Sequence, residues 1–426
     1  MAPLDNISAP GIRVPAGEPL LYNMRQEVAS LLNRKNINFP GAQPVSFARR
    51  HLEELARKDY FVCEKSDGMR YLLYLTEDEH GREAQYLIDR KNDYWYIPPD
   101  ELHFPIQNDR QGFHINTLID GELVMDKVPG GGMQPKYLVF DCLVLDGNNL
   151  MSRTLDKRIA YFRDHIFSPY KKLYEEFPEE KPHLRFLTEL KAMNFSYAIQ
   201  MMFTDVLPRL PHGNDGLIFT CRETEYKHGT DQHILKWKPE NENSVDFRLV
   251  LDFPLIQPDT IDRAEGITEP YLDYDSLPTC NLHVHAGDGK DDTWYGTMYL
   301  EPEQWEMMKA AGEPWNDRII ECWMDERRRW RYMRPRDDKT VANHISTVES
   351  VIESITDRVT EKDLIAVAGN IRTQWKRRAA EVDQKEVERK RNTSVSVNAP
   401  VNGGAKRKAE EQAAARPSPG PPVRPQ

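Results

Sequence analysis

The sequence predicts an α+β protein in which two strand-rich regions are joined by a polar hinge. Short segments with apolar side chains at alternate positions recur before residue 239, separated by glycine, asparagine, aspartate and proline. Two longer segments repeat apolar side chains every three or four residues, the spacing of amphipathic helices. A second series of alternating segments begins at Val245, after the polar stretch KPENENS. We therefore expect a domain boundary near residues 239–244.

The elements follow from these two spacings, in chain order. Alternation predicts strands at residues 71–75, 86–88, 94–97, 122–125 and 137–145. The longer spacing predicts helices at residues 158–177 and 197–207. Alternation resumes at residues 245–253, 281–284 and 294–300 and continues to Arg331, and an amphipathic helix follows at residues 344–359. The sequence shows no internal repeat.

The composition predicts a soluble chain, long enough for two or more domains. Of its 426 residues, 39% are hydrophobic and 29% charged, and the mean hydropathy is −0.69. The longest apolar stretch, residues 137–145, contains Asp141 and is much shorter than the roughly 18 residues of a membrane span. The amino terminus lacks the apolar segment of a secretory signal. Five cysteines without a CxxC pair favour a reducing compartment.

The net charge of −11 is unevenly distributed. Residues from Lys376 onward hold 12 Lys and Arg against 6 Asp and Glu, so this tail carries +6 and the preceding 375 residues carry −17. Few aromatic residues and clusters of Pro, Gly and Ala predict a disordered basic tail over residues 376–426, helical at most at its start. The basic clusters at residues 389–391 and 406–408 have the form of nuclear-import signals, and a merely solvated tail explains them equally well.

Several common phosphate and metal motifs are absent from the sequence. It has neither a GxxxxGK[ST] loop nor a GxGxxG turn. The glycines at residues 130–132 predict only a loop. Cys63 is followed six positions later by Met69, which excludes the cysteine-phosphatase spacing. His283 and His285 alternate on one strand face without a third ligand nearby, so we expect a surface strand there.

The segment EKSDGMR, residues 64–70, places Lys65 at the end of an apolar strand and before a tight turn. A lysine in such a position serves as a nucleophile when its amine is deprotonated. Lysine side chains have an ordinary pKa of about 10.4, so a lysine nucleophile needs nearby cations or a metal. The motif is short, and its meaning depends on the motifs that follow.

Two Asp-Gly segments come next. In DGELV, residues 120–124, strand alternation puts Asp120 and Glu122 on one face, and Gly121 lets a ligand or another backbone approach closely. DGLIF, residues 215–219, has the same Asp-Gly pair before an apolar strand. The carboxylate of its Asp215 suits a hard cation. Each of these segments, taken alone, is also explained as an ordinary turn leading into a strand.

Basic residues mark the last two motifs. In LKWKP, residues 235–239, strand alternation sends Lys236 and Lys238 to one face, and two ammonium groups on one face suit a phosphate. RYMRPRDDK, residues 331–339, brings three charged side chains together in the second region: Arg336, Asp338 and Lys339. An exposed strand face and a solvated basic edge are the plain alternatives, and the order of all the motifs is what favours a function.

In this order the motifs resemble the covalent nucleotidyltransferases, and among them the fungal-type, stand-alone mRNA capping guanylyltransferases, over about residues 15–375. The similar segments are EKSDGMR, LIDRKNDYWYI, LIDGELV, YLVFDCL, DGLIFT, LKWKP and WRYMRPRDDK with NHISTVESVIESI. The resemblance implies a nucleotidyltransferase domain of ligase-type, ATP-grasp-like antiparallel sheets with helices (residues 1–242), hinged to an OB-fold domain (243–339). It also implies that a helix within residues 340–375 packs back on the first domain.

The resemblance further implies a role for each candidate residue. Lys65 would carry GMP, Asp215 would bind the metal, and Lys236 and Lys238 would contact the α-phosphate. The remaining residues expected to bind GTP are Glu64 beside the nucleophile, Arg70, Arg90 and Glu122 at the ribose, Phe140 and Lys191 at the guanine, and Arg336, Asp338 and Lys339 at the departing pyrophosphate, with Arg331 and Arg334 as other arginines that could contact phosphate.

As implied by the resemblance, the cofactor is Mg²⁺, or Mn²⁺ in its place, and the acceptor is a 5′-diphosphate RNA. Implied partners are a separate RNA 5′-triphosphatase subunit and the phosphorylated carboxy-terminal repeats of RNA polymerase II, in the nucleus and without a membrane. Two alternatives stay open at this point. An ATP-dependent polynucleotide ligase would use the same lysine, and a non-catalytic RNA-binding or scaffold protein would keep only the fold.

Overall fold

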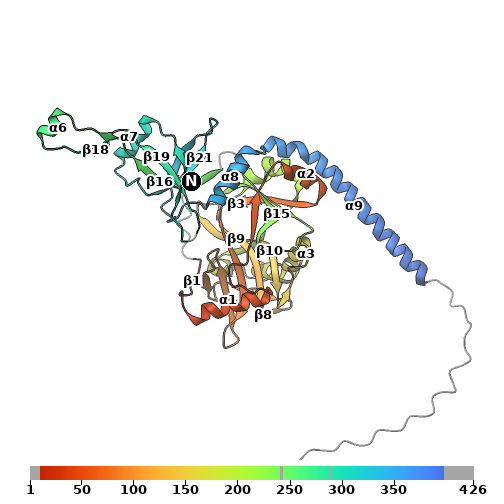
Figure 1. Cartoon of the computed structure of the whole chain (residues 1–426). Coiled ribbons are helices and arrows are strands. Elements are labelled where there is room, and N and C mark those ends of the chain that lie inside the picture. The colour runs from red at the N-terminus through yellow and green to blue at the C-terminus, as the bar shows by residue number, and fades with distance from the viewer. Residues whose placement is uncertain (1–9, 240–242, 288, 398–426) are drawn as a thin grey trace, which may run out of the picture. The chain divides into compact units, whose positions relative to one another are not determined.

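The computed structural model describes residues 10–239, 243–287 and 289–397 (Figure 1). The chain forms two units, residues 1–375 and residues 376–426. The second unit begins within helix α9 (Glu361–Val397), so the start of the predicted tail is helical, and the basic cluster at residues 389–391 lies on that helix. The cluster at residues 406–408 lies outside the described residues.

The larger sheet is antiparallel along its main path, in the order β1-β6-β5-β4-β9-β10-β11, and β12 pairs in parallel with β10. Its strands are β1 (Ile12–Arg13), β4 (Met69–Glu77), β5 (Glu83–Ile88), β6 (Tyr94–Ile97), β9 (Thr117–Lys127), β10 (Met133–Leu145), β11 (Asn148–Asn149) and β12 (Leu187–Leu190). The five strands predicted between residues 71 and 145 all lie within β4, β5, β6, β9 and β10, and are confirmed.

The smaller sheet has the order β13-β3-β14-β15-β2. Its strands are β2 (Ala42–Ser46), β3 (Tyr60–Ser66), β13 (Asn194–Phe195), β14 (Asn214–Cys221) and β15 (Gly229–Trp237). Three of the sequence motifs fall on adjacent strands of this sheet, with Lys65 on β3, Asp215 on β14 and Lys236 on β15. The strand order therefore explains how motifs about 150 residues apart meet.

Helical segments connect the strands of both sheets. They are α1 (Pro19–Leu31), α2 (Arg50–Arg57), α3 (Leu155–Tyr161), a π-helical segment (Phe162–Phe167), α4 (Ser168–Glu176), a short α5 (Ile199–Met201), a second π-helical segment (Met202–Val206), and 3₁₀ turns at Pro178–His183, Ser196–Ala198 and Leu207–Arg209. The helices predicted at residues 158–177 and 197–207 are confirmed as helical stretches, but each contains a π-helical segment. A small hairpin of β7 (Pro105–Ile106) and β8 (Asp109–Phe113) lies between β6 and β9 in the sequence.

Five strands after the hinge close into a barrel, in the order β16-β19-β20-β22-β21 (Figure 1, green to teal). They are β16 (Ser244–Asp252), β19 (Thr279–Val284), β20 (Thr293–Met298), β21 (Ile319–Met324) and β22 (Trp330–Pro335), accompanied by α6 (Thr260–Ala264), α7 (Pro302–Ala310) and the short pair β17 (Leu255–Ile256) and β18 (Tyr271–Leu272). A five-stranded closed barrel is consistent with an OB fold. The α+β class and the barrel are as predicted.

The chain after the barrel contributes to two hydrophobic cores. Val348, on α8 (Ile345–Thr356), is fully buried in the barrel core. Val359, Leu364 and Ile371, just before and within the first turns of α9, join the core beneath the smaller sheet. The Trp237 indole N–H donates to the Val359 carbonyl at 2.8 Å. Residues 340–375 therefore contact both the barrel and the smaller sheet.

All five cysteines are free and buried. Burial raises the pKa of the Cys63 thiol to about 12 and that of the Cys280 thiol to about 11. Buried thiols of this kind behave as small hydrophobic groups. Among the described residues, no helix combines the length and the apolar character needed to cross a membrane.

Candidate active site

Lys65 and Asp215 form the centre of the site. The Lys65 ammonium donates to both carboxylate oxygens of Asp215, at 2.6 Å and 2.8 Å. Lys238, at the end of β15, places its Nζ 2.9 Å from the same carboxylate. Two lysines and one aspartate from three of the sequence motifs thus converge.

Glycines next to the motif carboxylates let the strands approach closely. Gly216 has φ +138°, and a Cβ there would lie 2.0 Å from the Trp237 carbonyl oxygen. A Cβ on Gly68 would lie 2.6 Å from the Leu123 carbonyl oxygen, so this glycine lets the turn after Lys65 pack against β9. A Cβ on Gly121 would meet the Tyr137 ring at 2.5 Å. The close approach predicted at Gly121 and Gly216 is therefore made by protein groups, and Gly68 shows the same close packing.

The cations around Asp215 change its titration and that of Lys236. Burial acts to raise the pKa of the Asp215 carboxyl, but Lys65 and Lys238 outweigh it, so the net pKa is lowered and the carboxylate stays ionised. Burial lowers the pKa of Lys236, and the like charges of Lys238, Lys65 and Arg90 lower it further. The Lys236 backbone pairs within the sheet, and its side-chain ammonium makes no hydrogen bond or ion pair with another residue in the described part of the chain. An anion placed beside Lys236 would relieve this repulsion.

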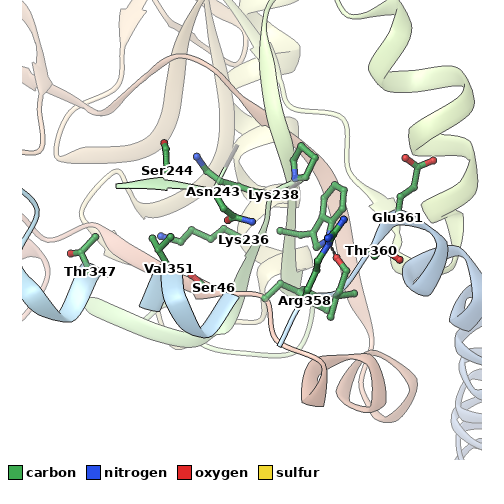
Figure 2. A pocket seen from close by; sticks show the side chains of 14 residues that line it. Ser46, Lys236, Lys238, Asn243, Ser244, Thr347, Val351, Arg358, Thr360 and Glu361 are labelled. Carbon is green, nitrogen blue, oxygen red and sulfur yellow. Dashed lines mark hydrogen bonds between the residues drawn. The ribbon is translucent and has the colours of Figure 1, made fainter. Parts of the chain in front are cut away.

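A cavity of about 320 Å³ lies next to the two lysines of β15 (Figure 2). Hydroxyl groups of Ser46, Thr347 and Thr360 line it together with Lys236 and Lys238. The lining of the cavity is part polar and part apolar, and it has room for a phosphate-sized group beside the lysine pair.

Arg70 and Phe140 face each other across β4, β9 and β10. The Arg70 guanidinium grips Asp120 with two hydrogen bonds, of 2.9 Å and 2.6 Å, and its Cζ lies 5.5 Å from the centre of the Phe140 ring. Phe140 is the extra residue of a β-bulge, since Val139 pairs with Gly121 and Asp141 pairs with Asp120. Bulges of this kind redirect side chains and occur beside active sites.

Lys191 is almost completely buried among acceptors. Its ammonium donates to the Ser66 hydroxyl at 2.5 Å and lies 3.5 Å from Glu64 and 3.6 Å from Glu122. Burial lowers its pKa, but Cys63, Glu64 and Glu122 raise it more, so the net pKa is above that of an ordinary lysine. An ammonium has three N–H donors, and each has an acceptor here, so a ligand that binds Lys191 has to replace one of them.

Glu122 and Arg90 complete this side of the site. Glu122 is opposite Arg70 in the β4–β9 pairing. Arg90 lies in the turn after β5, close enough for its charge to act on Lys236. Its guanidinium makes no hydrogen bond or ion pair with the residues that the structure describes. Arg90 is thus a cation of the site that remains available to a ligand.

The charged residues of the RYMRPRDDK motif make their contacts within the barrel region. Arg336 donates twice to Asp338 at 2.9 Å and once to Asp246 at 2.9 Å, and Lys339 also pairs with Asp246. The hydrogen bonds to Arg336 lower the pKa of Asp338 to about 2. All these contacts stay within the barrel region, so Arg336, Asp338 and Lys339 come together but are bound to each other and to Asp246.

Some residues of the site carry no signal in the sequence. Asp246 sits in VDFRLV, where alternation predicts an outward polar side chain, yet it is buried and pairs with residues about 90 positions away. Glu321 likewise binds Arg334 at 2.6 Å. His212 donates to Asp126 at 2.7 Å and lies 3.7 Å from Glu64. Each belongs to no motif, so only the folded arrangement identifies them.

The described residues contain no group of three or more histidine, cysteine or acidic side chains that could hold a metal by themselves. His285 lies 3.3 Å from Asp292, and it forms no metal-binding group with His283. Asp215 is the acidic residue at the centre of the site, and its ionised carboxylate is a hard oxygen ligand.

The chain matches two family models, "mRNA capping enzyme, catalytic domain" over residues 4–240 and "mRNA capping enzyme, C-terminal domain" over residues 242–365. It is 53% identical over 385 residues to the mRNA-capping enzyme subunit alpha of Neurospora crassa, covering 88% of this chain and 95% of that protein. The proteins of the same name from Schizosaccharomyces pombe and Yarrowia lipolytica are each 44% identical, over 85% and 86% of this chain and 87% and 92% of their own lengths.

Proposed function

We propose that this chain, which belongs to the family of mRNA capping enzyme alpha subunits, acts as a guanylyltransferase through a covalent GMP intermediate on Lys65. Guanylyltransferase activity follows from membership of the family, and the roles of individual residues are our proposal. The observation that supports the proposal is the Lys65–Asp215–Lys238 arrangement. In it, the ammonium groups of Lys65 and Lys238 both contact the Asp215 carboxylate.

In the first step, the Lys65 Nζ attacks the α-phosphorus of GTP. A P–N bond forms, the bond from the α-phosphorus to the bridging oxygen breaks, and pyrophosphate leaves. Attack requires a lone pair, so the Lys65 ammonium first releases a proton to solvent water and leaves its ion pair with Asp215. Lys236 and Lys238 then stabilise the charge that develops on the phosphoryl oxygens, and their proximity to Lys65 supports this role.

Asp215 fits a divalent cation, Mg²⁺ or Mn²⁺. Mg²⁺ is commonly bound through one or two carboxylates with substrate phosphates and waters completing its shell, so a dense cluster of acidic residues is not required. When bound, the metal would neutralise phosphate charge. Lys65 and Lys238 both contact the Asp215 carboxylate, and these contacts orient its oxygens.

The remaining site residues orient the nucleotide. Arg70, Arg90 and Glu122 hold the ribose, and Phe140 stacks on guanine, supported by the bulge that sets it apart from its strand neighbours. Lys191 reads the base by exchanging one of its acceptors, Glu64 or Glu122, for a guanine oxygen. Glu64 thereby contributes to base recognition through Lys191.

Arg336, Asp338 and Lys339 act on the pyrophosphate after the barrel closes on the first domain. For closure, Arg336 and Lys339 have to leave Asp246 and bind phosphate oxygens instead. Such an exchange is feasible because a phosphate is also a strong acceptor for both cations.

In the second step, an oxygen of a 5′-diphosphate RNA attacks the phosphorus of lysyl-GMP. The P–N bond breaks, GpppRNA forms, and Lys65 is restored. The diphosphate end must be supplied by an RNA 5′-triphosphatase on another polypeptide. Phosphorylated polymerase repeats would bring the enzyme to nascent RNA in the nucleus.

Labelling with α-³²P-GTP or α-³²P-ATP in the presence of Mg²⁺ tests the proposal. We expect acid-stable label on the protein from GTP and none from ATP. Lys65→Ala should abolish the label, and Lys58→Ala, a change at an exposed lysine of the same region, should leave it intact. Label from ATP alone would favour a ligase, and label on a folded Lys65→Ala protein would exclude this nucleophile.

A further inference from the structure

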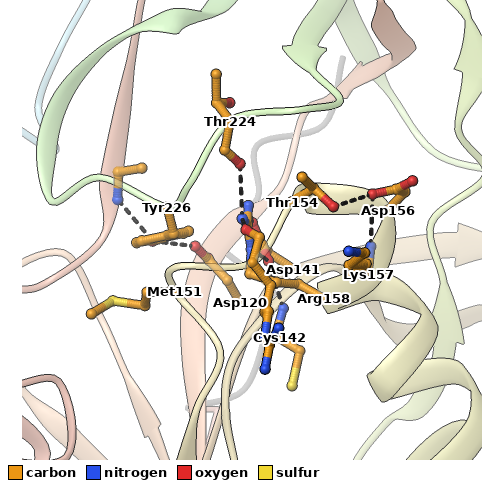
Figure 3. Close-up of polar contacts among 12 residues, drawn as sticks. Asp120, Asp141, Cys142, Met151, Thr154, Asp156, Lys157, Arg158, Thr224 and Tyr226 are labelled. Atoms are coloured by element: carbon orange, nitrogen blue, oxygen red, sulfur yellow. Dashed lines mark hydrogen bonds and ion pairs between the residues drawn. The ribbon is translucent and has the colours of Figure 1, made fainter. Parts of the chain in front are cut away.

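A buried polar network lies behind Arg70 and uses residues to which the mechanism assigns no role. Tyr226, in the loop between β14 and β15, donates its hydroxyl to Asp120 at 2.8 Å, and Asp120 is completely buried (Figure 3). The same hydroxyl accepts the Ala42 N–H at 2.9 Å. Burial and the Asp120 charge raise the pKa of Tyr226 well above its ordinary value, so the hydroxyl stays protonated and remains a donor.

The ring of Tyr226, in addition to its hydroxyl, has a charged neighbour. The Arg158 guanidinium lies 5.7 Å from the centre of the Tyr226 ring, a cation–π distance. Arg158 is itself fixed by Asp141 through two hydrogen bonds, of 2.7 Å and 2.8 Å, and by the Thr224 carbonyl at 3.0 Å. The Tyr226 side chain therefore has little freedom to move.

This network decides how Arg70 is oriented. A guanidinium has five N–H groups. On Arg70, Nε–H and one Nη2–H bind Asp120, the other Nη2–H points to the Tyr226 hydroxyl at 3.4 Å, and one Nη1–H binds the Ala42 carbonyl. One Nη1–H is left without a partner among the residues that the structure describes. Arg70 is thus locked with a single donor remaining for a ligand.

We propose that the Tyr226 hydroxyl is a specificity-determining positioning group. It holds Asp120, and through Asp120 the Arg70 guanidinium, in the orientation that presents the remaining N–H to a ribose hydroxyl of GTP. The inference rests on the proposed contact of Arg70 with the ribose. It predicts that the preference for a ribose over a sugar without hydroxyls depends on a tyrosine that does not contact the nucleotide.

Tyr226→Phe tests the inference with GTP and 2′,3′-dideoxy-GTP as paired substrates for protein labelling. With GTP, we expect the apparent affinity to fall about five- to tenfold, the scale of one lost hydrogen bond. The maximal labelling rate should stay within about threefold, because Lys65 and the α-phosphate are unchanged. With the dideoxy nucleotide, affinity should not change, so the discrimination ratio falls.

Tyr74→Phe is the matched control. Tyr74 is fully buried on β4, the strand of Arg70, and its hydroxyl has no hydrogen-bond partner among the described residues. This variant removes the same buried atom and should leave the discrimination ratio unaltered. Circular dichroism and thermal unfolding of both variants then separate a loss of stability from a loss of selectivity.

A double-mutant cycle with Arg70→Lys completes the test. If Tyr226 acts through Arg70, Tyr226→Phe should have no further effect on discrimination in the Arg70→Lys background. Additive effects, or an equal loss with both nucleotides in the single variant, would overturn the inference. Failure of the wild-type protein to label with GTP would instead overturn the proposed function on which it rests.

Discussion

At the scale of single residues, the site is a set of charged side chains that pair with one another. Lys65 and Lys238 share Asp215, Lys191 is surrounded by Glu64 and Glu122, and Arg336 and Lys339 share Asp246 in the barrel. Removing one partner from such pairs leaves an uncompensated charge, which is costly when the group is buried. Substrate binding therefore exchanges partners and creates few new charges.

His212 provides a pH-dependent contribution to this arrangement. Burial lowers the pKa of His212, but Glu64 and Asp126 raise it more, so the net pKa lies above the ordinary 6.5. The groups facing it are Glu64, Asp126, Lys136, which pairs with Asp126 at 2.7 Å, and Lys191, which pairs with Glu64. A raised pKa means that protonated His212 stabilises the fold below pH 6.5 and that this stabilisation is lost as pH rises through the folded-state pKa.

We therefore predict that His212→Asn lowers the free energy of unfolding by about 1 kcal/mol near pH 6 and by less at higher pH. Urea denaturation at a series of pH values measures the difference between wild type and variant. His228→Asn serves as the opposite control, because burial lowers the pKa of His228 and its contribution should grow as pH rises. Equal differences at all pH values for His212→Asn would contradict the assignment.

Sequence patterns identified site residues where a motif kept them at a fixed spacing along one strand. Lys65, Asp215 and Lys238 were each named as candidates from their own motifs, and the structure brings them together because β3, β14 and β15 are neighbours in one sheet. Tyr226 and His212 were not predicted. Each acts through contacts with residues far away in the sequence, such as Asp120 for Tyr226 and Asp126 for His212, and an isolated residue gives no periodic signal.

At the scale of elements, the close packing of β14 on β15 depends on Gly216. Its φ of +138° is outside the range that other residues adopt readily, and the space for a side chain is filled by the Trp237 carbonyl. The smaller sheet carries Lys65, Asp215 and Lys238, so a separation of these two strands would also separate the catalytic groups. Stability and activity are therefore coupled at this position.

We predict that Gly216→Ala destabilises the protein by at least about 2 kcal/mol and slows labelling with GTP. Denaturant unfolding and the labelling rate measure the two effects. Gly296→Ala is the control, because Gly296 is also in a strand, β20, and no atom lies within 4 Å of its added Cβ. A Gly216→Ala protein as stable as the Gly296→Ala protein would show that the strands can separate without cost.

The strands that the sequence predicted contain apolar segments bounded by turn residues. Strands β4, β9 and β10 run for 9, 11 and 13 residues, and their apolar segments were predicted, as was the four-residue β6. Helix α2 has 8 residues and β13 has 2, too few to distinguish a period from chance. The bulge at Phe140 and the π-helical segments were also not predicted, because they arise from packing against neighbouring elements.

At the scale of the whole molecule, the charge is divided between an acidic body and a basic tail. Residues 1–375 carry −17 and residues 376–426 carry +6. Within the acidic body, cations gather at Lys65, Lys236 and Lys238 and along the arginine-rich segment 327–336. An enzyme that grips a nucleotide and the end of an RNA needs positive potential at the site and not over its whole surface.

We predict that a protein ending at Trp375 labels with GTP at a rate within about twofold of the full chain, because the candidate site residues and all four hydrophobic cores lie within residues 1–375. Its affinity for RNA should be lower and should depend less steeply on salt, since the +6 tail is absent. Filter binding of a 5′-diphosphate RNA at two salt concentrations measures the slope. A steep slope in the shortened protein would mean that the acidic body itself binds the RNA backbone.

The burial of every cysteine has a practical consequence for watching this enzyme move. Thiol reagents attack the thiolate, and all five native thiols are shielded and have raised pKa values, so the folded protein should be inert to maleimide dyes. A single cysteine introduced at an exposed barrel position, such as Met307, which is 65% exposed, would then carry the only fluorophore. Fluorescence from that dye could report the approach of the barrel to bound nucleotide in real time, without first removing any native residue.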